Sequence, residues 1–227
     1  MKIGLIGALD CEITEFCRDF NAVKSKFKDI FVGSFKGHEI YICLCGVGKV
    51  NAAACTQRLC DLTNVDCIIN SGVAGAVTRN LGVCDIAVSS LLTYHDFYPI
   101  EVLDKYEPHC SVFKADDKLL KLACDACSEL GKTEKNFRYD TGMIVSGDKF
   151  VEDSSYVKQL SAKYGALCTE MEGAAIAHVA YLNKTPFIVI RAISDNADEN
   201  ADMSFEQMSA IAAKRAGFVV TSMISAL

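Results

Sequence analysis

Short apolar runs recur along the chain and predict five β-strands. They span residues 2–7, 39–45, 65–70, 85–92 and 187–193, and they are rich in β-branched and other apolar side chains. Several of these runs are apolar throughout instead of alternating with polar residues, which is typical of central strands covered on both faces. The pattern therefore favours a sheet that lies between layers of helices.

Segments with helical spacing separate these runs and predict five helices, which span residues 48–62, 116–130, 155–163, 170–182 and 204–226. Alternation of strands and helices is typical of an α/β fold. The last helix has the clearest start, because Ser204 and Gln207 form a capping-box pattern and Met203 and Met208 can pack across it as a hydrophobic staple. No linker, repeat or charge block interrupts the chain, so we expect one domain over residues 1–227.

The composition excludes several classes of protein. Of the 227 residues, 51% are hydrophobic and 23% are charged, which excludes a disordered or fibrous chain. The net charge is −6 and no dense run of Lys or Arg occurs, so we expect neither nucleic acid nor an anionic membrane as a partner. No stretch reaches the roughly 20 apolar residues of a membrane-spanning helix, and no signal-peptide pattern is present, so we expect a cytoplasmic protein.

The cysteines and histidines give no sign of a metal site. The 12 cysteines are spread from Cys11 to Cys168, which favours reduced thiols that fill the core over a disulfide framework. One CxxC motif, from Cys124 to Cys127, lies in a helical pattern without a second pair, and the four histidines have no ligand spacing. Because structural zinc needs a closed set of four ligands, we expect no metal, and we expect no cofactor.

Candidate functional residues follow three of the predicted strands. In open α/β sheets, ligands bind beyond the carboxyl ends of the strands, where loops and helix N-termini converge. The strand KIGLIG runs into ALDCE, VDCIIN runs into SGVAGA, and FIVIRAI runs into SDNADE. We therefore look for chemistry in these three segments.

Two of these segments carry charged residues that have both a functional and a structural interpretation. Glu12 follows the first strand, and either it acts in catalysis or, with Asp10, it favours a helix N-terminus. Arg191 lies in an otherwise apolar strand, where burial is costly without a carboxylate or a ligand as partner. Ser194 and Asp195 follow at the end of that strand. The alternative is that Arg191 ends an edge strand and that Ser194 or Asp195 caps a turn.

Glu170 and Glu172 precede a helix rich in small residues, which must pack closely against another element. If both glutamates are helical, they point roughly 200° apart, so at most one faces a pocket. The alternative is that both lie at a solvated helix start. The strings GVGK at 46–49 and SGVAG at 71–75 each open a helix or loop after a strand, but neither matches a phosphate-binding fingerprint.

Five strings taken together are more specific. GALDCEI, GVGKVNAA, VSGDKF, TEMEGAAIAHV and RAISDNAD, in this order over essentially the whole chain, resemble the 5′-methylthioadenosine/S-adenosylhomocysteine nucleosidases of the purine and uridine phosphorylase superfamily. The resemblance implies a three-layer α/β/α sandwich with a mixed, partly closed central sheet, usually as a homodimer. It also implies an enzyme of methionine salvage, in which water cleaves the N-glycosidic bond of 5′-methylthioadenosine, S-adenosylhomocysteine or 5′-deoxyadenosine and releases adenine.

The resemblance implies three catalytic residues. Asp195 matches the general acid that protonates adenine N7, and Glu12 matches the carboxylate that positions and deprotonates the attacking water. Arg191 matches a second group that holds the water. Cleavage passes through an oxocarbenium-like transition state, as in glycoside hydrolysis, so the acid and the base need pKa values shifted in opposite directions.

The same resemblance implies the substrate-binding residues. Glu172 matches the residue that accepts hydrogen bonds from the ribose hydroxyls, and Met171 matches one that packs against the sugar. Phe150 matches the ring that stacks on adenine, the Val151 backbone matches the group that reads the base edge, and Phe205 lines the pocket for the 5′ substituent. The other expected lining residues are Leu9, Val73, Ala74, Gly75 and Ser194.

Two features differ from the family pattern, and two other functions stay open. Val73 stands where many relatives have Ser, which leaves Glu12 and Arg191 to hold the water, and residues 97–112 differ from the usual loop that reaches across the dimer to the 5′ site. A nucleoside phosphorylase of the same superfamily would need cationic and hydroxyl groups around the glycine-rich loops. A non-catalytic binding protein would have lost one of the three carboxylates at positions 12, 172 and 195, which are all present.

Overall fold

The computed structural model describes residues 1–27, 29–195 and 205–227, and for residues 195 and 205–210 it describes the backbone alone. The elements, in chain order, are β1 (Lys2–Gly7), α1 (Asp10–Asp19), β2 (Val23–Lys24), β3 (Ile30–Phe35), β4 (His38–Leu44), α2 (Lys49–Thr63), β5 (Cys67–Ala76), β6 (Ile86–Tyr94), α3 (Val102–Lys105), β7 (Phe113–Lys114), α4 (Asp117–Thr133), β8 (Tyr139–Ser146), α5 (Ser154–Tyr164), β9 (Cys168–Glu170), α6 (Gly173–Leu182), β10 (Phe187–Asp195) and α7 (Phe205–Ser225). The predicted alternation of strands and helices is confirmed.

The described strands form one mixed sheet that closes on itself over part of its width. Its order is β10-β6-β8-β9-β5-β1-β4-β3-β2, and β10 also pairs with β5, so that β5, β9, β8, β6 and β10 make a closed ring. Strand β5 runs parallel to β1 and to β10, whereas β10 runs antiparallel to β6. The expected mixed and partly closed central sheet is therefore confirmed.

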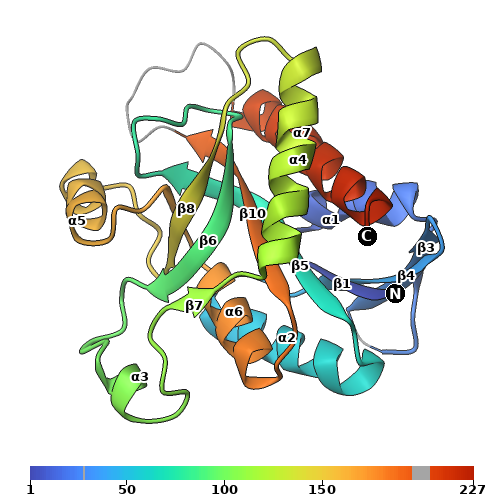
Figure 1. The fold of residues 1–227 in the computed structure, drawn as a ribbon, viewed down its shortest axis with the longest axis horizontal. Coiled ribbons are helices and arrows are strands. Elements are labelled where there is room, and N and C mark those ends of the chain that lie inside the picture. The colour runs from blue at the N-terminus through green and yellow to red at the C-terminus, as the bar shows by residue number, and fades with distance from the viewer. Residues whose placement is uncertain (28, 196–204) are drawn as a thin grey trace.

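Helices cover both faces of the sheet, which explains the uniformly apolar strands. Helices α2 and α6 lie on one face, and α1, α4 and α7 lie on the other (Figure 1). In β1, Ile6 packs into the core beneath α2 and α6, while Ile3 and Leu5 pack into the core beneath α1, α4 and α7. Helix α6 packs closely against α2, as its small residues predict.

Several predicted boundaries were wrong. Residues 168–170 form strand β9, and helix α6 begins only at Gly173, so the predicted helix over 170–182 starts too early. The string SGVAG continues strand β5 instead of opening a loop. Strands β3 and β8 were not predicted, because the glycine and polar residues in IFVGSF and YDTGMIVS weaken their apolar pattern. The capping box proposed at Ser204 falls outside the described residues.

Strand β10 is an interior strand at Arg191. This residue pairs with Gly72 of β5 on one side and with Ala87 of β6 on the other. The alternative in which Arg191 ends an edge strand is therefore wrong, and its guanidinium needs partners inside the protein.

Candidate active site

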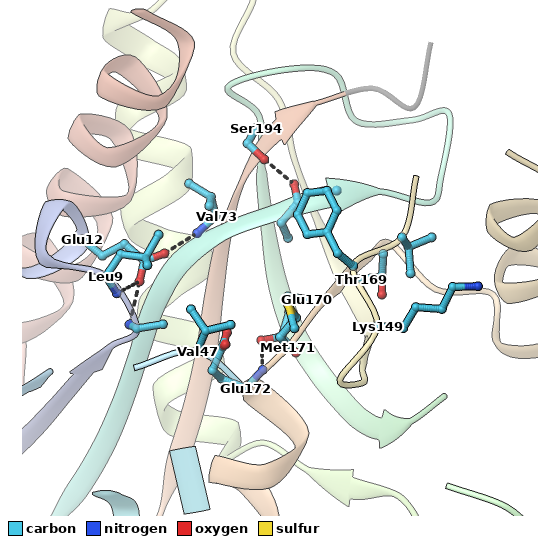
Figure 2. Close-up of a pocket in the computed structure, with 15 residues that line it drawn as sticks. Leu9, Glu12, Val47, Val73, Lys149, Thr169, Glu170, Met171, Glu172 and Ser194 are labelled. Carbon is cyan, nitrogen blue, oxygen red and sulfur yellow. Dashed lines mark hydrogen bonds between the residues drawn. The ribbon is translucent and has the colours of Figure 1, made fainter. Parts of the chain in front are cut away.

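A cavity of about 250 Å³ lies beside β5, where β1, β8, β9 and β10 end (Figure 2). Its walls are mostly apolar, with a few carboxylate and hydroxyl groups directed into it, as in many small-molecule sites. The sequence-predicted residues that line it are Leu9, Glu12, Val73, Ala74, Gly75, Phe150, Val151, Met171, Glu172 and Ser194. Arg191 is buried and contacts the cavity residue Glu172.

The side chains of Asp195 and Phe205 are outside the described residues. The backbone of Asp195 is described, and it pairs with Gly75, which lines the cavity. Ser194, one residue earlier, donates its hydroxyl to the Ala74 carbonyl at 3.4 Å. The end of β10 therefore runs along the cavity.

Glu12 sits in the first turn of α1 and is held by three backbone donors. Its Oε2 accepts hydrogen bonds from the amides of Ala8 at 2.7 Å and Leu9 at 3.1 Å, and its Oε1 accepts one from the amide of Val73 at 3.1 Å. The prediction that Glu12 lies at the start of a helix is confirmed. Its side chain also lines the cavity. The three amide donors therefore fix the orientation of this carboxyl group in the cavity wall.

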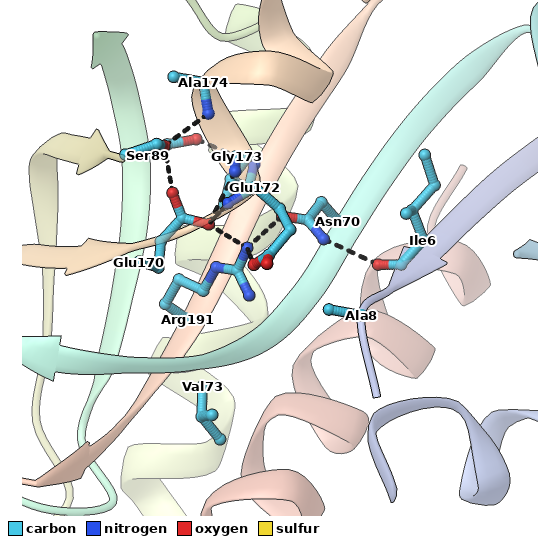
Figure 3. A network of polar contacts seen from close by, with 12 residues as sticks. Ile6, Ala8, Asn70, Val73, Ser89, Glu170, Glu172, Gly173, Ala174 and Arg191 are labelled. Atoms are coloured by element: carbon cyan, nitrogen blue, oxygen red, sulfur yellow. Dashed lines mark hydrogen bonds and ion pairs between the residues drawn. The ribbon is translucent and has the colours of Figure 1, made fainter. Parts of the chain in front are cut away.

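Arg191 is the centre of a buried polar network (Figure 3). Its Nη2 forms an ion pair with Glu170, lies 3.5 Å from Oε2 of Glu172 and donates to Oδ1 of Asn70 at 2.7 Å. Burial acts to lower the pKa of Arg191, but the negative charges of Glu170, Glu172 and Glu12 outweigh it and raise that pKa. The structure thus supplies the carboxylate partners that the strand position required.

Glu170 organises the start of helix α6. Its carboxylate accepts hydrogen bonds from the Ser146 hydroxyl and from the amides of Glu172 at 3.0 Å and Gly173 at 2.7 Å. Glu170 ends strand β9 and Glu172 is the N-cap of α6, so neither lies within the helix. The expectation that at most one of the two carboxylates faces a pocket was wrong, because it assumed a helical segment. Both residues line the cavity, and both carboxylates reach the Arg191 guanidinium.

Glu172 faces the cavity and is held against the GVGK loop. Its Oε1 accepts a hydrogen bond from the Gly48 amide at 2.9 Å. Burial raises the pKa of Glu172 to about 7, although the positive charge of Arg191 and the Gly48 amide act in the opposite direction. The carboxyl group is therefore poised to change its charge near neutral pH.

Gly72 lies in the string SGVAG, but the sequence did not indicate which groups this glycine has to accommodate. A Cβ atom at this position would lie 2.1 Å from Nη1 of Arg191 and 2.6 Å from Oε1 of Glu12. Glycine inside a strand often marks a close approach of another group, and this was the available signal. Here it lets the Arg191 guanidinium and the Glu12 carboxylate both approach the backbone of β5.

Metal ligands, membrane-spanning helices and disulfides are not features of the described residues. Within the described parts of the chain, no group of three or more His, Cys, Asp or Glu side chains is placed to hold a metal ion. No described helix has both the length and the apolar character needed to cross a membrane. The 12 cysteines form no disulfide, and several are buried.

Comparisons with known proteins give a consistent result. Residues 2–225 match the family model of the phosphorylase superfamily. The chain is 36% identical over 236 residues to a 5′-methylthioadenosine/S-adenosylhomocysteine nucleosidase of Haemophilus influenzae (strain 86-028NP), with 100% of both chains covered.

Two solved structures of nucleosidases with the same name are also similar. One, from Neisseria meningitidis in complex with methylthio-immucillin-A, has a TM-score of 0.87 and 32% identity, covering 100% of this chain and 99% of that one. The other, from Colwellia psychrerythraea 34H in complex with adenine, has a TM-score of 0.88 and 32% identity, covering 99% of this chain and 94% of that one.

Proposed function

This chain belongs to the 5′-methylthioadenosine/S-adenosylhomocysteine nucleosidase family of the phosphorylase superfamily, and from that membership we propose that it hydrolyses the N-glycosidic bond of these two nucleosides and releases adenine. The observation that carries the proposal is that Glu12 and Glu172 line one nucleoside-sized cavity, while a buried Arg191 lies 3.5 Å from Glu172 and is influenced by the charge of Glu12. The family match over residues 2–225 also supports a single catalytic domain spanning residues 1–227.

Each side of the bond that breaks needs a different group. Adenine leaves readily only when it is protonated, and we assign this proton to Asp195, whose backbone runs beside Gly75 in the cavity wall. Glu12, held by three amide donors, is assigned as the base that accepts a proton from the attacking water. Water adds to the anomeric carbon as the C–N bond breaks, with the positive charge of an oxocarbenium-like sugar in between.

The other cavity residues are assigned to binding. Glu172, which lines the cavity, is assigned to accept hydrogen bonds from the ribose hydroxyls, and Met171 to pack against the sugar. Phe150, which is 69% exposed at the cavity, is available to stack on adenine beside Val151. Phe205 is assigned to the 5′ pocket from the family resemblance. Leu9, Val73, Ala74, Gly75 and Ser194 complete the described walls.

Arg191 has a broader role in this proposal than holding water. Its Nη2 already binds Asn70 and Glu170, so the guanidinium fixes the carboxylates around the cavity. We keep its contact with the catalytic water as a prediction. Val73 donates its backbone amide to Glu12, but its apolar side chain supplies no hydroxyl, which many relatives have at this position.

The charge around Arg191 favours a hydrolase over a phosphorylase. Three carboxylates, from Glu12, Glu170 and Glu172, act on one buried guanidinium. A phosphate dianion would be repelled by this arrangement, whereas neutral water would not. Val73 and Ala74, where a phosphorylase would need polar side chains, have none to offer.

The experiment that tests the proposal measures adenine release from 5′-methylthioadenosine in phosphate-free buffer. We expect turnover without phosphate, and loss of nearly all turnover in Asp195→Asn with nucleoside binding still measurable, because the acid contributes about 10²- to 10⁴-fold. Strict phosphate dependence would support the phosphorylase. Tight nucleoside binding by the unaltered protein without any product would support a non-catalytic binding protein.

We also propose a homodimer in the cytoplasm. Val50, which is 79% exposed, follows Lys49, and Tyr98, which is 92% exposed, lies two residues after Asp96. An ion pair between Lys49 and Asp96 joins the two segments that carry these side chains. Exposed apolar side chains on two joined segments support an interface between two copies of the chain.

A further inference from the structure

An ionic cluster of Lys49, Asp96 and Asp148 joins three loops beside the cavity. Nζ of Lys49 lies 2.6 Å from Oδ1 of Asp96 and 3.5 Å from Oδ2 of Asp148. The amide of Asp148 donates to Oδ2 of Asp96 at 2.8 Å, and the amide of Lys49 donates to Oδ1 of Asp148 at 2.9 Å. The cluster thus links the GVGK loop, the segment after β6 and the segment after β8.

The cluster adjoins two residues that line the cavity, Glu172 through a hydrogen bond and Phe150 along the chain. Gly48 precedes Lys49, and its amide donates to Oε1 of Glu172 at 2.9 Å, so consecutive amides bind Glu172 and Asp148. Asp148 lies two residues before Phe150. Gly48 has a φ of +95°, and a Cβ there would lie 3.2 Å from Oδ1 of Asp148, so the loop is closely fitted to this carboxylate.

The cluster differs from the ordinary surface ion pairs of this protein. The side chains of Lys49 and Asp96 are 21% and 23% exposed and that of Asp148 is 51% exposed, whereas those of the surface pair Lys114 and Asp117 are 65% and 76% exposed. Exposed pairs contribute little because water and salt screen them, while partly buried pairs are screened less. The cluster is therefore able to fix the loop geometry in a way that the surface pair is not.

We propose that Lys49, Asp96 and Asp148 are positioning residues for nucleoside binding. They hold the Gly48 amide in its hydrogen bond with Glu172, and this bond orients the carboxylate that accepts hydrogen bonds from the ribose hydroxyls. This inference rests on the proposed function. Without the cluster, the Gly48 loop is free to move away from Glu172, and each nucleoside that binds must first restore that geometry.

The test compares Lys49→Met with Lys49→Arg, Asp96→Asn and the matched surface control Lys114→Met. For each variant, kcat and KM for 5′-methylthioadenosine are measured together with thermal unfolding. We expect KM to rise about tenfold in Lys49→Met with kcat within about twofold, because the lost geometry serves binding of the ground state and the transition state alike. Lys49→Arg should recover most of the loss, and Lys114→Met should behave as the unaltered protein.

A second substrate separates positioning from a general loss of structure. With a 2′-deoxy nucleoside, which lacks a hydroxyl that Glu172 would bind, the effect of Lys49→Met on KM should shrink to less than about threefold. Unchanged KM in both Lys49→Met and Asp96→Asn, or an equal loss on both substrates, would overturn the inference. If Lys49→Met does not fold, Asp96→Asn decides. Absence of adenine release by the unaltered protein would instead refute the proposed function.

Discussion

Replacing Glu172 with Gln should stabilise the protein at alkaline pH and weaken its activity. The Glu172 carboxyl is buried beside Arg191, and burial raises its pKa to about 7 from the ordinary 4.5. A raised pKa means that folding favours the protonated form, so this group stabilises the folded state at low pH and that contribution is lost as the pH rises through about 7. Gln keeps an acceptor for the Gly48 amide but carries no charge at any pH.

The size of the effect follows from the pKa difference. A change from 4.5 to about 7 corresponds to on the order of 3 kcal/mol of free energy that opposes the ionised form in the folded protein. At about pH 8 nearly all of this cost is present, whereas at about pH 5 only a minor part is. The stability difference between Glu172→Gln and the unaltered protein should therefore change by on the order of 2 kcal/mol between these two pH values.

The assay is thermal unfolding of both proteins at the two pH values. For a chain of this length, on the order of 2 kcal/mol corresponds to a relative shift in Tm of about 4–8 °C. The exposed residue Glu152 provides a control, because Glu152→Gln should give the same Tm difference at both pH values. Activity should fall about 10- to 100-fold in kcat/KM, since a charged acceptor for the ribose is lost. A Tm difference for Glu172→Gln that does not depend on pH would refute the reasoning.

Two further predictions concern Gly72 and the exposed residue Val50. Gly72→Ala places a Cβ 2.1 Å from Nη1 of Arg191. We therefore expect the free energy of unfolding, measured with denaturant, to fall by about 1–3 kcal/mol and kcat to fall at least about a hundredfold. Normal turnover would contradict the close approach of Arg191 and Glu12 to the backbone of β5 at Gly72. Val50→Glu should weaken the proposed dimer at least about tenfold in analytical ultracentrifugation while leaving the Tm of the monomer nearly unchanged, because Val50 is 79% exposed. A dimer of unaltered strength would place the interface elsewhere.

The sequence was sufficient for the layers of the fold because the strands that build them are buried on both faces. The apolar runs of β1 and β10 have no polar face, and this is the signature that distinguishes a covered sheet. The string SGVAG was misassigned because its small residues carry little strand signal. Its glycine at position 72 is needed for clearance, and that need depends on Arg191, which lies 119 positions later in the sequence.

The site could be predicted in part. The position of Arg191 in an apolar strand indicated a carboxylate partner, and burial costs alone support that argument. The identity of that carboxylate could not be predicted, because it depends on the junction between β9 and α6. At this junction Glu170 and Glu172 both turn toward the Arg191 guanidinium. A two-residue spacing gives no information on such a junction. Contacts among distant loops, such as Lys49 with Asp96, likewise require the tertiary structure.

The single guanidinium shared by Glu12, Glu170 and Glu172 has a consequence for what the cavity attracts. When all three acids are ionised, the ensemble has two negative charges in excess, enclosed by apolar walls. An uncharged nucleoside gains little from this field on arrival, but its sugar becomes positive as the bond to the base lengthens, and the attraction then grows. The surplus of acids over bases in the resting protein is thus matched to a charge that exists only while the reaction is under way.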